Sequence, residues 1–297
     1  MTVDLVVLTP AYLDYTFVGL EGLPSLGEER FAGDMLRSPG GGGIVAVAGA
    51  RLGLSTALIA PLGDDLAGRF VRRALEDEGV EVMEYRGKRT PTTMVLPVEG
   101  DRAMVTVDPG LRARAADIGP YDPRAIAATL EQIDLLPAGP SAYLTCGEDD
   151  ARAYAGRLPR GPSRPRGLFV NRRESAILTG EDDPERAVEQ LAPAADTVVV
   201  TVGAEGALAA NGGRTLRVDG IRAEPVVDTT GAEELFATAF AWAELSGADA
   251  ATALPWANLY AGLSVTTHTA AGGAATRERL LDEGARRGLP ELPVVAR

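Results

Sequence analysis

Short apolar runs alternate along the chain with longer segments in which apolar residues recur at helical spacing. The runs, which we expect to be buried strands, are 3–8, 57–60, 143–145, 168–170 and 197–201. The segments with helical spacing are 43–52, 65–78, 122–134, 150–157, 184–191 and 231–245. Strands that alternate with helices form mostly parallel sheets with helices on both faces. The pattern therefore predicts a three-layer, doubly wound α/β fold, in a single domain over residues 1–297.

Two stretches, at about 12–37 and 82–108, interrupt this alternation. They are rich in Gly, Pro and Thr and contain short extended runs, such as 93–96 and 103–107. This pattern is typical of β-hairpins. We expect the two stretches to form a small β-strand lid over the carboxyl edge of the sheet, where open α/β folds bind their ligands.

The composition is that of a globular protein, with 45% hydrophobic and 24% charged residues among 297. It excludes a disordered chain and a fibrous one. No run approaches the roughly 18 apolar residues that a membrane span needs, and the first residues lack the pattern of a secretory signal. We therefore expect a cytoplasmic protein that does not enter the membrane.

The charged and rare residues exclude several kinds of site. A net charge of -13 disfavours nucleic acids and anionic membranes as partners. One cysteine and one histidine are too few for a disulfide or a multi-histidine metal site, and no GxxxxGK[ST] phosphate loop is present. Any phosphate group must therefore be held mainly by backbone N–H groups and a bound cation.

A segment that reads VVDTTGAEELF, at 226–236, precedes an alanine-rich helical pattern. A turn of small residues that leads into a helix directs several N–H groups and the positive end of the helix dipole at one point. Such a point suits an anion, for example a phosphoryl group in transfer. The structural alternative is that Thr230 caps the helix while Glu233 and Glu234 complement its dipole.

This segment resembles the C-terminal signature of the ribokinase-like, or PfkB, family of carbohydrate and nucleoside kinases, usually DTTGAGDxF. Four further segments resemble family motifs in the same order, over nearly the whole chain. The glycines at 40–43, with ARLG at 50–53 and GDD at 63–65, are similar to the N-terminal signature. NRRE at 171–174 resembles the N-x-x-E magnesium motif. TVGAEGA at 201–207 resembles the nucleotide-binding strand and turn, and 257–266 the helix beside the adenine.

The resemblance implies an enzyme that transfers the γ-phosphoryl group of ATP to a hydroxyl of a sugar or nucleoside. It also implies Mg²⁺, leaves a monovalent cation open, and makes a homodimer through the lid plausible. The implied roles are a base (Glu234), an anion hole (Gly231, Ala232, Glu233), acceptor contacts (Asp14, Gly40, Gly41), nucleotide contacts (Thr201, Gly203, Gly206, Asn258) and magnesium held through water (Asn171, Glu174).

Several of these residues also have a purely structural interpretation. Asp14 fits a turn aspartate, and Asn171 with Glu174 fits the N-terminus of a surface helix. Gly203 and Gly206 fit a tight turn between strands, which is compatible with a place beside a nucleotide.

The sequence departs from the family pattern where catalysis is expected. The usual Gly-Ala-Gly-Asp reads Gly-Ala-Glu-Glu at 231–234, so the base is one methylene longer and Glu233 adds a side chain at the anion site. A second hypothesis is therefore a kinase-like protein that binds a nucleotide or a sugar-like ligand without turnover. Ile44 or Val45 stands where an asparagine usually meets the sugar, and Thr269-Ala270 replaces Gly-Ala. Residues 143–171 are too few for a full strand-helix-strand unit.

A rival motif, G-x-G-x-x-A at 41–46, fits the dinucleotide pattern of NAD-dependent oxidoreductases. That motif needs a buried strand immediately before it. The preceding residues 30–39 are polar and end in proline, which disfavours this interpretation.

Overall fold

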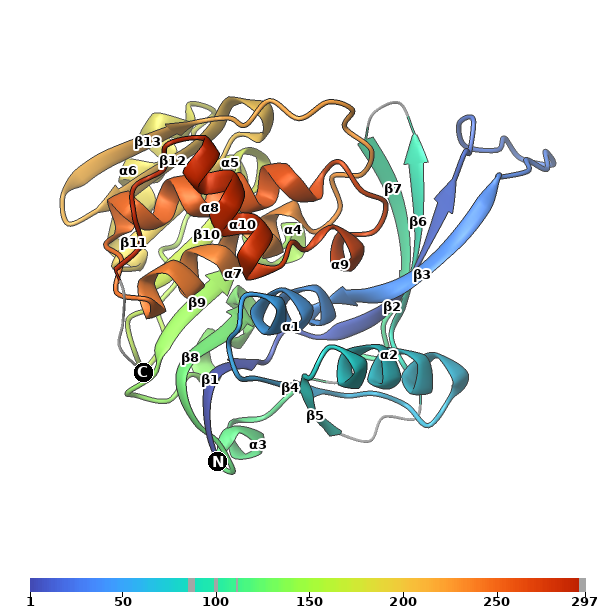
Figure 1. Ribbon diagram of the computed structural model, residues 1–297, viewed down its shortest axis with the longest axis horizontal. Coiled ribbons are helices and arrows are strands. Elements are labelled where there is room, and N and C mark those ends of the chain that lie inside the picture. The colour runs from blue at the N-terminus through green and yellow to red at the C-terminus, as the bar shows by residue number, and fades with distance from the viewer. Residues whose placement is uncertain (85–88, 99–100, 111, 294–297) are drawn as a thin grey trace.

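A sheet of nine strands forms the centre of the computed structural model, which describes residues 1–84, 89–98, 101–110 and 112–293 (Figure 1). The strand order is β13-β12-β11-β10-β9-β8-β1-β4-β5. The bounds are β1 (Thr2–Val7), β4 (Thr56–Ala60), β5 (Glu81–Glu84), β8 (Asp122–Thr129), β9 (Ser141–Thr145), β10 (Gly167–Asn171), β11 (Thr197–Thr201), β12 (Gly206–Asn211) and β13 (Arg214–Asp219). In this order, the strands from β11 to β5 run parallel to one another. Strand β12 pairs antiparallel with β11, and β13 pairs antiparallel with β12. The predicted doubly wound, mostly parallel sheet is confirmed.

Helices cover both faces of this sheet (Figure 1). One face carries α1 (Gly42–Arg51), α2 (Leu66–Asp77), α7 (Ala232–Leu245), α8 (Ala250–Ser264), α9 (Ala270–Gly273) and α10 (Arg277–Arg286). The other carries α3 (Ala115–Ile118), α4 (Glu148–Ala153), α5 (Arg172–Thr179) and α6 (Pro184–Leu191). In β1, Leu5 and Val7 pack on the first face and Val6 on the second. Burial on both faces explains why the strands read as unbroken apolar runs.

A small sheet of four strands, ordered β3-β2-β6-β7, projects from the large one (Figure 1). Its strands are β2 (Ala11–Val18), β3 (Asp34–Gly41), β6 (Thr92–Val98) and β7 (Asp101–Val107). We call this sheet the lid. It lies within the two stretches that interrupt the alternation, except that β3 extends to Gly41 and that residues 82–84 belong to β5 of the large sheet. Positions 85–88 and 99–100 of the second stretch lie outside the described residues.

The helix predicted at 122–134 is wrong. Residues Asp122–Thr129 form strand β8, between β1 and β9, and a 3₁₀ helix follows at Leu130–Leu135. The Asp-Pro start and the alanines favour a helix locally. In the sheet, however, Ala125 packs on one face and Ile126 on the other, so burial on both sides determines the conformation.

The helix predicted at 150–157 is shorter and begins earlier, because α4 spans only Glu148–Ala153. The unit between β9 and β10 is accordingly an abbreviated one, as the short interval had indicated. Helix α1 follows Gly41, the last residue of the lid strand β3. The glycines at 41–43 therefore do not follow a strand of the parallel sheet, which is the context that a dinucleotide motif requires. Within the described ranges, no helix is both long and apolar enough to cross a bilayer.

Candidate active site

The candidate residues gather at the carboxyl edge of the large sheet. Asn171 is the last residue of β10 and Thr201 the last of β11, and the two are paired in register. The N-terminus of α7, which begins at Ala232, reaches the same place, because the amide of Asn171 contacts Glu233. This edge is where open α/β sheets bind ligands.

The turn before α7 is fixed by Asp228, a buried carboxylate. Its Oδ1 accepts a hydrogen bond from the Thr230 N–H at 2.9 Å, and its Oδ2 accepts one from the Thr269 N–H at 3.1 Å. The turn is thereby tied to the segment that leads into α9. The hydroxyl Oγ1 of Thr230 is buried and has no hydrogen-bond partner among the described residues. An unsatisfied buried hydroxyl at a helix N-terminus indicates a place for a ligand.

Gly231 is required at the start of α7 for two reasons. Its φ of 74° is in the left-handed region, and a Cβ there would lie 2.3 Å from Cβ of Ala270 and 2.9 Å from Cδ1 of Ile44. Ile44, which with Val45 is a candidate for the position where the family usually has an asparagine, is thus buried in the packing beneath the turn.

Asp14 lies on the lid strand β2 with only 8% of its surface exposed. Burial raises the pKa of Asp14 to about 7; the negative charges of Glu234 and Asp228 add to this effect, and a hydrogen bond from Thr93 opposes it. A Cβ at Gly40 would lie 2.1 Å from the Oδ2 atom of Asp14. Gly40 therefore makes room for this carboxyl, a role that differs from the predicted direct contact with substrate.

Glu234 is half-buried in the first turn of α7. Burial raises the pKa of its carboxyl, and the positive charge of Arg102 acts in the opposite direction. Because its charge also acts on Asp14, the structure brings together a lid carboxyl and a helix carboxyl that are 220 positions apart. A carboxyl with a raised pKa suits proton transfer near neutral pH.

Glu233 turns toward the N-x-x-E segment. Its Oε2 accepts a hydrogen bond from the Asn171 Nδ2 at 3.2 Å. Asn171 and Glu174 form a capping box at the start of α5, in which each side chain accepts the other's backbone N–H. The two residues therefore do begin a helix, as the structural interpretation expected, but Glu174 is buried and does not lie on a surface helix face.

The carboxyls of Glu174 and Glu233 form a buried acidic pair. Burial raises the pKa of Glu174 to about 7, and the charge of Glu234 adds to this. Burial and the charges of Glu174 and Glu234 raise the pKa of Glu233 further. Oε1 of Glu233 is buried without a hydrogen-bond partner among the described residues. A cation would stabilise the charged form of both carboxyls and would give Oε1 of Glu233 a partner.

The side-chain oxygens of Asn171, Glu174 and Glu233 fit a hydrated cation. The capping box engages one oxygen of each side chain of Asn171 and Glu174, which leaves few oxygens for direct ligation. Over the described part of the chain, no group of three or more Asp, Glu, His or Cys residues is arranged to hold a metal directly. Magnesium usually keeps several of its waters, so these residues fit magnesium held through water.

The predicted nucleotide-side residues lie on β11, its following turn and α8. Gly203 has a φ of 62°, and a Cβ there would meet nothing within 4 Å, whereas a Cβ at Gly206 would lie 2.0 Å from the Val218 carbonyl oxygen. The Asn258 amide donates to the Asp219 carbonyl at 2.9 Å. Gly206 and Asn258 are thus held against β13, whereas the space beside Gly203 is open.

Several residues near the candidate site had no recognisable signal in the sequence. Arg102 of the lid donates from Nη1 to Oγ1 of Thr229 at 2.9 Å. Thr93 bonds Asp14, and the contact joins adjacent lid strands. Nothing in the local pattern of β6 or β7 marks these residues, because their importance depends on how the lid folds back on the turn before α7.

A cavity of about 580 Å³ lies elsewhere, beside the start of β1. Leu52, Trp242, Trp256 and Leu281 are among its lining residues, and none of the candidate site residues is. It is at the opposite edge of the sheet from the carboxyl ends of the strands, so it is not the candidate active site.

Comparison with known proteins agrees with this geometry. Residues 27–277 match the model of the pfkB family of carbohydrate kinases. This chain belongs to the pfkB carbohydrate kinase family. Among curated relatives, ribokinase of Bacillus subtilis is 29% identical to this pfkB family member over 276 residues, which cover 86% of this chain and 91% of the relative.

Solved structures show that this pfkB family member has the ribokinase-like fold. A putative ribokinase from Agrobacterium tumefaciens superimposes with a TM-score of 0.81 at 20% identity, covering 98% of this chain and all of that one. Arabidopsis thaliana ribokinase, solved with ribose and ATP, gives a TM-score of 0.75 at 24% identity over 95% of this chain and 98% of that one. The predicted family and fold are both confirmed.

Proposed function

We propose that this protein is an ATP-dependent kinase that transfers the γ-phosphoryl group to a hydroxyl of a sugar or nucleoside. The observation that carries the proposal is the meeting of Asp14 and Glu234 beside the N-terminus of α7. An acceptor hydroxyl needs a group that binds it and a base that takes its proton, close to a place for the transferring anion. We assign these roles to Asp14, to Glu234 and to the turn before α7.

The acceptor lies, in this proposal, between the lid and α7. The Asp14 carboxyl accepts hydrogen bonds from acceptor hydroxyls, since a buried carboxyl that is bonded to Thr93 has lone pairs for further donors. Glu234 takes the proton of the hydroxyl that attacks the phosphorus. The lid excludes water, which would otherwise compete as the acceptor.

The transferring phosphoryl group is held by the turn at 228–231 and the first turn of α7. We assign the anion to the helix N–H groups without an intrahelical acceptor and to the hydroxyl of Thr230, which has no hydrogen-bond partner among the described residues. Because Glu233 bonds to Asn171, its carboxyl is directed to the α5 side of the site. Hydrated Mg²⁺, held by Asn171, Glu174 and Glu233, would neutralise phosphate charge.

The relatives support ATP as the donor. The Arabidopsis ribokinase was solved with ribose and ATP, and a ribokinase from Cryptococcus neoformans with ADP. We assign the nucleotide in this chain to the open turn at Gly203, beside the 2.6 Å ion pair between Arg172 and Glu205. A monovalent cation remains open in this proposal, and an assay in K⁺ against a tetramethylammonium buffer tests it.

The experiment is a screen of ribose, fructose, other sugars and nucleosides with ATP and Mg²⁺, followed by ³¹P NMR. We expect one acceptor class to give ADP together with a new phosphate monoester signal. The alternative function is binding without turnover, which Glu233 and Glu234 suggested. A melting shift with ATP, but no monoester from any acceptor, would favour that alternative.

A further inference from the structure

An arginine of the lid contacts the turn that we assign to the phosphoryl group. Arg102 is the second residue of β7, and its Nη1 donates to Oγ1 of Thr229 at 2.9 Å. The two residues are 127 positions apart. The bond therefore joins the lid to the phosphoryl-binding turn, and it places a guanidinium at that turn.

Arg102 lies on the face of the lid that carries the acceptor residues. Alternate residues of a strand share a face, so Arg102 shares one with Thr106. Oγ1 of Thr106 lies 3.1 Å from Oγ1 of Thr93, which in turn bonds the Asp14 carboxyl. One lid face thus carries a carboxyl for the acceptor and a guanidinium beside the turn.

The charges around this guanidinium make it useful for phosphoryl transfer. The carboxyls of Asp14, Glu233 and Glu234 lie around the proposed path of the phosphoryl group, and the negative charge of Glu234 acts on both of the others. The charge of Arg102 reaches Glu234 and counteracts the effect of burial on its pKa. A phosphoryl group in transfer carries further negative charge on its three equatorial oxygens. A cation from the lid would offset this repulsion.

We propose that Arg102 is a catalytic residue that the lid delivers to the transferring phosphoryl group, with Thr229 as the positioning residue for its guanidinium. The inference rests on the proposed kinase function. It means that lid closure does two things at once, because it covers the acceptor and brings the cation to the turn. Phosphoryl transfer then requires the closed lid, whereas nucleotide binding alone does not.

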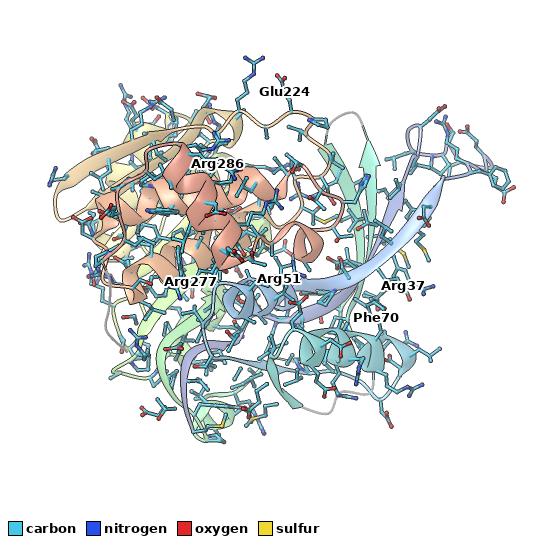
Figure 2. The ribbon with its side chains drawn as sticks, in the orientation of Figure 1. Arg37, Arg51, Phe70, Glu224, Arg277 and Arg286 are labelled. Carbon is cyan, nitrogen blue, oxygen red and sulfur yellow. The ribbon has the colours of Figure 1, made fainter. Side chains whose placement is uncertain are left out.

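The first test compares Arg102→Met with Arg37→Met. Arg37 is an exposed arginine on the opposite lid face, over the ring of Tyr15, and Figure 2 shows it on the lid strand β3. We expect Arg102→Met to lower kcat by roughly 10²- to 10³-fold, as for the loss of one transition-state donor. Its melting shift with ATP and Mg²⁺ should equal that of the wild type. Arg37→Met should keep kcat within about twofold. An Arg102→Met enzyme with wild-type kcat would overturn the inference.

A conservative variant separates charge from folding. Arg102→Lys keeps the positive charge but loses the planar fork of donors, so its kcat should lie between those of the wild type and Arg102→Met. Thr229→Val should lower kcat less than Arg102→Met, because it frees the guanidinium without removing it. If Arg102→Lys were no faster than Arg102→Met at equal melting temperature, the positive charge would not be what matters, and the proposal would fail.

A binding experiment distinguishes failure of this inference from failure of the kinase proposal. ADP, Mg²⁺ and aluminium fluoride together mimic the transferring phosphoryl group without turnover. We expect aluminium fluoride to raise the melting temperature of wild type and Arg37→Met beyond ADP and Mg²⁺ alone, and Arg102→Met to lose that increment. A wild type without turnover in the acceptor screen contradicts the kinase proposal. An absent increment, or one that Arg102→Met retains, contradicts the role of Arg102.

Discussion

Glu233 and Glu234 are neighbours in the sequence, but their side chains face different parts of the site. Glu233 accepts a hydrogen bond from the Asn171 amide, on the side of α5. Glu234 interacts electrostatically with Arg102 and Asp14, on the side of the lid. Successive helix residues point about 100° apart, so one turn serves both directions. The glutamate that replaces the family glycine is therefore directed toward Asn171, one of the residues that we propose hold magnesium through water.

Replacing Glu233 tests this division. Glu233→Gln keeps an acceptor for the Asn171 amide and removes the buried charge next to Glu174. We expect the unfolding free energy of the variant, without ligands at pH 8, to exceed that of the wild type by roughly 1 to 3 kcal/mol. Its melting temperature should rise accordingly. Its affinity for Mn²⁺, followed by electron paramagnetic resonance, should fall. Glu278→Gln, at an exposed helix position, is the control; equal behaviour of the two variants would refute the buried acidic pair.

Asp14 predicts a pH dependence of stability. Its pKa is raised from 3.8 to about 7 in the folded protein, so between these pH values the folded state binds more protons than the unfolded state. Its contribution to the unfolding free energy therefore falls as pH rises from about 4 to 7. Asp14→Asn should flatten the profile in this range and stabilise the protein at pH 8 by roughly 1 to 3 kcal/mol. Urea melts across pH measure this, and an unchanged slope in the variant would contradict it.

The sequence could predict the site only where a residue belongs to a continuous motif. Glu234 and Asn171 stand in such motifs, so their places at the carboxyl edge followed from strand and helix order. The bond between Arg102 and Thr229 spans two separate elements, and no local pattern encodes it. Gly40 was assigned to substrate contact. In the structure, a Cβ added at Gly40 would collide with the Asp14 carboxyl, and this closeness follows from the pairing of β2 with β3.

The segment that leads into α9 holds the turn of α7 at the cost of backbone strain. Thr269 has a φ of 65°, where a β-branched residue is disfavoured, yet its N–H bonds to Asp228 and its hydroxyl caps α9. The family usually has glycine here. A hydrogen-bonded side chain thus replaces the conformational freedom of glycine at this position.

Two substitutions at Thr269 separate strain from capping. Thr269→Gly removes strain of about 1 kcal/mol or more and loses only a few tenths as a cap, so it should raise the melting temperature slightly. Thr269→Ala keeps the strain and loses the cap, which should lower the stability by about 1 kcal/mol. In calorimetry, the glycine variant should therefore have the highest melting temperature, the wild type the next highest and the alanine variant the lowest. A glycine variant that melts no higher than the alanine variant would show that Thr269 is not strained.

Among the elements, strands made of a continuous run of β-branched or other apolar residues could be predicted from the sequence, whereas β8 could not. The strand at Thr197–Thr201 is a run of valines and threonines, which indicates a strand by itself. Strand β8 contains several alanines, which favour a helix when no neighbour is considered. Only its place between β1 and β9 makes the extended form the better one.

The outer face of the lid is apolar and exposed. Met35, Met94, Val105 and Val107 are between 37% and 61% exposed, and strand pairing places Met94 opposite Val105. Monomers seldom leave a large contiguous apolar patch uncovered. We propose that the lids of two copies cover one another, as the resemblance implied.

The size of the protein in solution tests this homodimer. We expect light scattering after gel filtration to give twice the chain mass of 30.9 kDa. Val105→Lys should shift the population toward the monomer, because it places a charge in the apolar contact. A wild type that remains monomeric at high concentration would count against pairing through the lid.

We propose that the molecule is a kinase in which Glu234 is the base. The most direct measurement is the turnover number of the wild type and of Glu234→Gln, with the acceptor from the screen, beside the melting shift that ATP and Mg²⁺ produce. We predict that Glu234→Gln lowers kcat by roughly 10²- to 10⁴-fold and leaves the melting shift unchanged. Equal turnover in the two proteins, with equal nucleotide binding, would contradict the assignment of Glu234 as the base.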